Sequence, residues 1–136
     1  MLPYEKMVLS LYKDGKHQRD IYEKLMEADN RVIRALTKVL RSSPDPDIRE
    51  CCAELLREHT CARAVPDLIE ALEDEAWHVR QDAMWAIEAL CQFENGGLTR
   101  WLDIDLLDDN PREIKAKVTA WWKVNKRFIE NNPLLW

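Results

Sequence analysis

The feature that most constrains the fold is a pair formed by a β-branched apolar residue and an arginine. It occurs at Ile48 and Arg49 and again, 31 residues later, at Val79 and Arg80. Core positions behind the two pairs match at the same interval: Cys52 with Ala83, and Leu56 with Ile87. A helical unit repeated at this kind of interval cannot bury its apolar face alone and stacks on its copies. The register therefore predicts a chain of stacked units.

Two weaker copies flank these units. One interval earlier, Ile21 and Leu25 take the core positions, but His17 stands where the apolar residue and arginine should begin. After Val79, the same register continues if a four-residue insertion is allowed for near positions 95–98. The core positions then fall on Ile114, Val118 and Trp122.

Each unit is predicted to be a pair of helices. One apolar stripe lies within about 100° of a helical wheel and consists of Val79, Ala83, Ala86, Ile87 and Leu90. A shorter helix before it carries Val65, Leu68, Ile69 and Leu72, with Pro66 in its first turn, where a missing N–H is tolerated. The preceding pair repeats that pattern at an offset of 32, with Ile33, Leu36 and Leu40. No period-two alternation is long enough to predict a sheet.

The expected architecture is an all-α, right-handed α-solenoid in a single domain spanning 1–136. Four helix pairs are expected at roughly 3–28, 30–60, 62–91 and 97–127, followed by a capping tail at 128–136. A closed helical bundle is the alternative. A bundle would not require an aspartate to recur at a fixed spacing before each pair of an apolar residue and an arginine.

Composition and charge exclude several classes of protein. With 46% hydrophobic and 33% charged residues, the chain fits neither a disordered segment nor a membrane span. The net charge of -5 and the mixing of basic with acidic residues argue against nucleic acid, which is bound through a basic face. Glu5 and Lys6 interrupt the first apolar stretch, so that no signal peptide is predicted and a cytoplasmic protein is expected.

The four cysteines do not form a recognisable framework, because no CxxC occurs among them. Cys52 falls on an apolar helix face, where it is expected to act as a small core residue. A zinc site would recruit His59 and Cys61 with a distant fourth ligand, Cys91 or His78. We therefore expect no metal site and no cofactor.

At these residues the chain resembles a HEAT repeat of the short, roughly 30-residue type found in phycobilisome lyases. The later unit carries the signature residues Pro66, Leu68, Leu72, Asp74, Val79, Arg80, Ala83 and Leu90. The earlier unit keeps Pro46, Asp47, Ile48, Arg49 and Leu56. The match covers Val32 to Cys91, and the first and last pairs match only in spacing and apolar pattern.

The resemblance implies a ladder of ion pairs along the stack. In HEAT-like proteins the repeated arginine joins aspartates of the turns between helices. Arg49 and Arg80 are similarly placed to meet Asp45, Asp47 or Asp74. These arginines are expected to be structural rather than ligand-binding.

The resemblance also implies that the second helix of each pair lines the concave face. Trp85 lies about 140° from the apolar stripe, so it is expected to project from that face together with Met84, while Ala83 and Ile87 are core. The predicted partner-binding residues are Tyr22, Glu23, Glu50, Glu54, Arg57, Gln81, Met84, Trp85, Glu88 and Lys123. An exposed aromatic residue rimmed by charges is typical of a binding hot spot. The alternative is that Trp85 is covered by the segment 96–108 or by the tail.

The C-terminal sequence AWWKVNKRFIENNPLLW leaves two interpretations open. Trp121 and Trp122 are adjacent, so at most one can point fully into the core. The apolar tail can fold back as the cap that a last repeat needs. Alternatively, it docks into a partner or a second copy of the chain.

No catalytic constellation is found in the sequence. The histidines His17, His59 and His78 are each placed at a helix end, and no nucleophile is arranged beside them. The chain is therefore expected to be a non-enzymatic scaffold or adaptor that binds a protein partner, with no nucleic-acid and no membrane partner. The alternative is a lyase-like or chaperone-like helper related to phycobilin lyases, with a chromophore against Trp85, Tyr22 and Met84.

Overall fold

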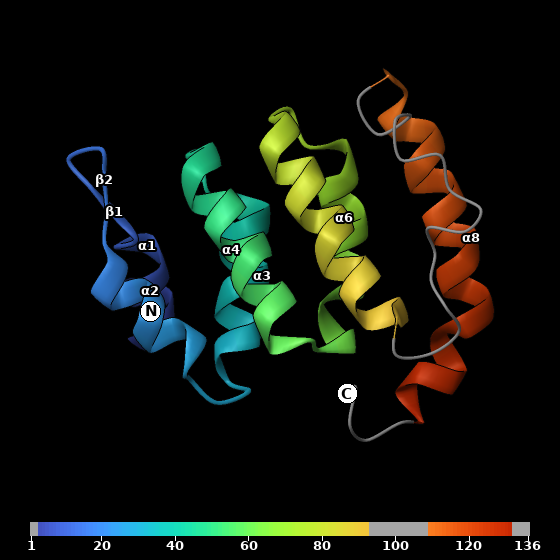
Figure 1. Ribbon diagram of the computed structural model, residues 1–136, viewed down its shortest axis with the longest axis horizontal. Coiled ribbons are helices and arrows are strands. Elements are labelled where there is room, and N and C mark those ends of the chain that lie inside the picture. Colours follow the sequence, from blue (N-terminus) through green and yellow to red (C-terminus); the bar gives the residue numbers. More distant parts are fainter. Residues whose placement is uncertain (1–2, 93–108, 132–136) are drawn as a thin grey trace.

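A computed structural model of the chain describes residues 3–92 and 109–131. The helices follow one another along the longest axis of the molecule in chain order, as an open stack rather than a closed bundle (Figure 1). The second helices of successive units pack on one another, and so do the first helices. This arrangement confirms the predicted all-α repeat fold.

The first unit departs most from the repeat. Helices α1 (Pro3–Leu9) and α2 (Arg19–Met26) are joined by a short antiparallel hairpin, β1 (Tyr12–Lys13) and β2 (Lys16–His17). Its turn residues Asp14 and Gly15 have positive φ angles of 55° and 74°, as a tight two-residue hairpin turn requires. This sheet was not predicted, because its strands are too short to show alternation.

The second unit consists of α3 (Val32–Ser42) and α4 (Pro46–His59). Helix α4 begins with proline at its first position, and the Asp45 carboxylate accepts a hydrogen bond of 2.9 Å from the Asp47 N–H. Both features satisfy or remove the donors that a helix start leaves unpaired. Thr60 ends the helix in the left-handed conformation, with φ 42°.

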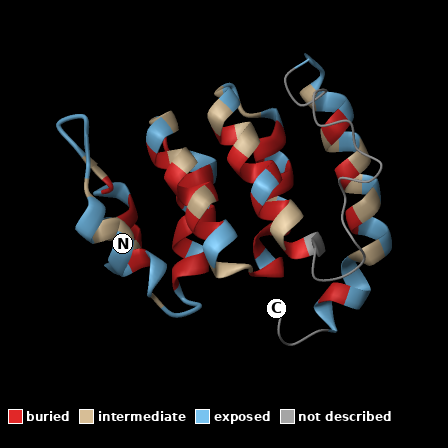
Figure 2. Ribbon diagram, in the orientation of Figure 1, coloured by how far each residue is buried: buried red, intermediate tan, exposed pale blue. Residues whose placement is uncertain are grey.

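In the third unit the first helix is interrupted. The turn η1 (Ala62–Ala64) leads into α5 (Val65–Glu70), which tightens into η2 (Ala71–Glu73) before α6 (Trp77–Gln92). The apolar stripe predicted on α6 is buried along its length (Figure 2). Its members pack with α4 on one side and with α5 and η2 on the other.

The last described helix, α8 (Pro111–Glu130), packs on α5 and η2 and carries the buried residues Ile114, Val118, Trp122 and Ile129. Lys115 on α8 reaches Glu70 on α5 at 2.9 Å. Of the two adjacent tryptophans, Trp122 is buried and Trp121 is partly buried. The first helix expected for the fourth pair, and most of the tail 128–136, lie outside the described residues.

No helix in the described ranges has the length and apolar character needed to cross a bilayer.

Candidate functional site

Trp85 stands on the face formed by α2, α4 and α6, which we call the inner face. Its side chain is 40% exposed, and the Arg57 guanidinium lies 5.8 Å from the ring centroid. Both residues line a pocket of about 480 Å³ together with Glu88 and Ala89. The predicted exposure of Trp85 is confirmed, whereas the segments that were expected to cover it in the alternative lie outside the described residues.

Met84 was predicted to project beside Trp85, and this prediction is wrong. The side chain is only 1% exposed. Helix α6 is packed on both sides, so the buried sector of its surface is wider than the stripe of the helical wheel. Ala53, which matches Met84 on α4, is also fully buried.

The other predicted partner-binding residues differ in their exposure to solvent. Glu23, Arg57 and Lys123 are exposed, and Tyr22, Glu50, Glu54, Gln81 and Glu88 are partly buried. The Tyr22 hydroxyl donates a hydrogen bond of 3.2 Å to Glu54, which links α2 to α4. Lys123 belongs to α8, which packs chiefly on η2 and α5, so the structure does not join it to the Trp85 pocket.

A cluster of carboxylates lies beside Trp85 on the inner face. Oxygen atoms of Glu50 and Glu54 on α4 and Asp82 on α6 all lie within 4.8 Å of one another. Burial, followed by the charges of Glu54 and Glu50, raises the pKa of Asp82 to about 7. The sequence analysis did not include Asp82, although it stands three residues after Val79 and four before Ala86, on the edge of the core stripe.

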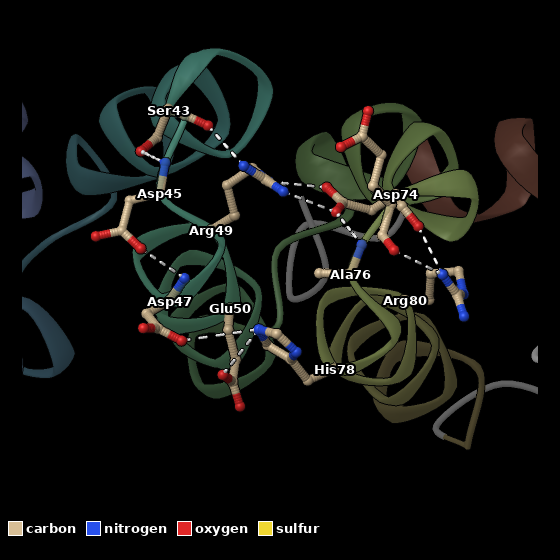
Figure 3. A network of polar contacts seen from close by, with 10 residues as sticks. Ser43, Asp45, Asp47, Arg49, Glu50, Asp74, Ala76, His78 and Arg80 are labelled. Atoms are coloured by element: carbon tan, nitrogen blue, oxygen red, sulfur yellow. Dashed lines mark hydrogen bonds and ion pairs between the residues drawn. The ribbon is translucent and has the colours of Figure 1, made fainter.

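A second group shares Glu50. The His78 Nε2 atom lies 3.6 Å from a Glu50 oxygen and 3.8 Å from an Asp47 oxygen. Figure 3 shows the imidazole of His78 directed from α6 toward these α4 side chains. Asp47 and His78 stand at equivalent positions of successive repeats. Nothing else in the sequence indicates that their side chains lie close together.

The predicted arginine ladder is present and uses Asp74 (Figure 3). Arg49 binds the Asp74 carboxylate through two hydrogen bonds of 2.9 and 3.0 Å, and it also donates to the Ser43 carbonyl at 2.8 Å. Arg80 donates to the Asp74 carbonyl at 2.8 Å. Ser43 and Asp74 are 31 residues apart, so each arginine binds the equivalent carbonyl of its own repeat.

The thiols Cys51, Cys52 and Cys61 are buried and reduced. Burial raises the pKa of Cys51 to about 12 and raises that of Cys52 further. The His59 Nε2 atom lies 2.9 Å from the Leu25 carbonyl oxygen. His59 therefore links α4 to α2.

A larger pocket of about 830 Å³ lies on the opposite layer, between α1, α3 and η1. Arg31, Arg34 and Arg63 line it beside the ring of Tyr4. Arg31 is already paired with Asp29 at 2.7 Å. The sequence analysis did not predict this pocket, although Arg31 and Arg63 recur at the 32-residue offset of the first helices.

A comparison with protein-family models finds the HEAT repeats over residues 33–119. No curated protein and no solved structure matches the chain.

Proposed function

This chain belongs to the HEAT-repeat family, and from that premise we propose that it is a non-enzymatic scaffold that binds a protein partner on its inner face. HEAT repeats commonly serve as surfaces for protein–protein interaction and are in general non-catalytic. We also propose that the chain is related to the HEAT proteins of the phycobilisome-lyase type.

The observation that carries the proposal is the exposure of Trp85 beside Arg57. A tryptophan that is 40% exposed leaves much of a large apolar ring available to a partner. Tryptophan and arginine are the residue types most enriched at interface hot spots. The guanidinium at 5.8 Å from the ring also holds the indole in place before binding, which lowers the ordering cost of association.

The acidic surroundings of Trp85 indicate the character of the partner. Glu88 lines the pocket together with Trp85 and Arg57, and the carboxylates of Glu50, Glu54 and Asp82 form a cluster on the same inner face. Complementary potentials across an interface favour the correct partner and speed association. We therefore propose a partner segment that carries an apolar anchor and basic flanks.

The lyase-like or chaperone-like helper has less support. It would need Trp85, Tyr22 and Met84 around a chromophore, and Met84 is buried. Tyr22 is in addition engaged with Glu54. The observations therefore support the protein-binding scaffold better.

A matched pair of tryptophan variants tests the proposal. Tagged wild-type protein, Trp85→Ala and Trp77→Ala would be used to isolate partners from native host cells, and affinities would be measured with the purified partner. Trp77 is 61% exposed at the start of α6, outside the Arg57 pocket, so it controls for the loss of any surface tryptophan. We expect Trp85→Ala to weaken binding by about 2 kcal/mol, or roughly 30-fold, and Trp77→Ala to leave it nearly unchanged. Equal affinities of wild type and Trp85→Ala would contradict the proposal.

A further inference from the structure

The pocket beside Trp85 contains a carboxylate that lacks a partner. Glu88 on α6 lines this pocket of about 480 Å³ together with Trp85, Arg57 and Ala89. One of its carboxylate oxygens, Oε1, is shielded from solvent and accepts no hydrogen bond from residues 3–92 and 109–131. A shielded acceptor without a donor loses its hydration and gains nothing in exchange. Because the last torsion of a glutamate side chain rotates over a broad range, a donor that enters the pocket can bind this carboxylate and remove the cost.

The charge of Glu88 also lacks a counterpart. Burial raises the pKa of Glu88, and no positive charge in the described part of the chain offsets that effect. Burial likewise raises the pKa of Glu54 and Asp82, but there the charge of Arg57 offsets part of the rise. Among these three acids, Glu88 is the one that no cation of the described residues compensates. The missing group is therefore a hydrogen-bond donor with a positive charge.

Lysine fits this combination better than arginine. Its apolar stem can lie along an aromatic ring while its charged head stays free to bind, and the partly exposed Trp85 offers such a ring. The ammonium is a compact charge with three donors, so that a single carboxylate oxygen suffices as its acceptor. Arginine pairs best with both oxygens of a carboxylate at once, whereas Oε1 of Glu88 is turned away from solvent.

We propose that the Trp85 pocket binds a lysine side chain of the partner, with its stem against the indole ring and its ammonium on the Glu88 carboxylate. Glu88 then selects a basic segment, while Trp85 supplies the apolar contact. Arg57 does not oppose this arrangement, because the charges of Glu54 and Asp82 balance its own. The inference rests on the proposed function, since it defines the chemistry of the partner at the same site.

The test measures how the ammonium of a peptide and the carboxylate of Glu88 depend on each other. Peptides from a random display library are selected on the immobilised full chain, and those that no longer bind Trp85→Ala are kept as probes. Each probe is compared, by calorimetry, with a counterpart in which norleucine replaces lysine, which keeps the stem and removes the ammonium. We expect norleucine to weaken binding to the wild type at least about tenfold, and binding to Glu88→Gln less than about twofold.

The matched control is Glu58→Gln. Glu58 is an exposed acid of α4 that does not line the pocket, so its variant loses the same charge and should respond to norleucine like the wild type. Melting curves of the unliganded proteins give a second readout. Glu88→Gln should melt at the temperature of the wild type or higher, because it replaces a buried carboxylate without a partner by a neutral group. A fall in Tm of about 5 °C or more would make Glu88 a structural residue and overturn the proposal.

The binding data separate this inference from the proposed function. If the probes need Trp85 but contain no lysine, or if norleucine weakens binding to the wild type and to Glu88→Gln equally, Glu88 does not bind a lysine, while the scaffold function stands. If no peptide depends on Trp85, the proposed function fails together with this inference.

Discussion

Replacing Arg49 with alanine tests whether the ladder stabilises the stack. The side chains of Arg49 and Asp74 are only 14% and 13% exposed, and the pair joins α4 to the turn before α6. Arg49→Ala removes two charge-assisted hydrogen bonds and one to the Ser43 carbonyl. It leaves Asp74 in a mostly buried place with the Ala76 N–H as a remaining donor. Breaking such a pair from one side typically costs about 3 kcal/mol or more.

The assay is urea unfolding followed by circular dichroism, with a double-mutant cycle. A loss of about 3 kcal/mol corresponds to a fall in Tm of roughly 10 °C for a chain of this size. Asp74→Ala also removes the hydrogen bond to Ala76, so only the cycle isolates the ion pair, and we expect a coupling of about 2 kcal/mol. An unchanged m value would show that the stack still unfolds as one unit.

The matched control is Arg41→Ala. Arg41 also pairs with an aspartate of the next unit, Asp67, at 3.1 Å, but its side chain is 59% exposed. Exposed pairs contribute less than about 1 kcal/mol. If Arg49→Ala destabilises the protein no more than Arg41→Ala, and the coupling with Asp74 is negligible, the ladder does not hold the repeats in register.

Three further predictions concern the inner face and the core. Trp85→Ala should lower the free energy of unfolding by only about 1 kcal/mol, whereas Ile87→Ala and Met84→Ala, at fully buried positions, should each lower it by about 2 to 5 kcal/mol in the same urea assay; equal losses at all three would mean that Trp85 is a packing residue. Cys51 and Cys52 should resist a thiol reagent at pH 8 until the protein unfolds, because burial raises the pKa of both thiols, and rapid labelling of the native protein would contradict this. Wild-type stability should fall as pH rises from about 4 to 7, since folded Asp82, with its pKa raised from 3.8 to about 7 by burial and by the charges of Glu54 and Glu50, keeps a proton that the unfolded chain has lost; melting curves of Asp82→Asn should lack this component, and identical pH profiles would refute it.

The repeat register could be predicted because it depends on neighbours close in sequence. A helix of 3.6 residues per turn places residues three and four apart on one face, so the stripe from Val79 to Leu90 identified the core of α6. The same periodicity placed Trp85 outside that core. The resemblance to HEAT repeats predicted that Arg49 and Arg80 bind aspartates of the turns, but it left Asp45, Asp47 and Asp74 open as partners. The structure selects Asp74 as the partner of Arg49.

Tertiary structure alone decided how wide the buried sector of each helix is. A helical wheel gives the direction of Met84 but not the number of elements that cover it, and α6 is covered by α4 on one side and by α5 and η2 on the other. For the same reason Asp82, at the edge of the stripe, is buried although its side chain is charged. Its meeting with Glu50 and Glu54 depends on how far α6 is rotated and shifted against α4. Those two quantities are set by the packing of all side chains between the helices, which no local pattern in the sequence contains.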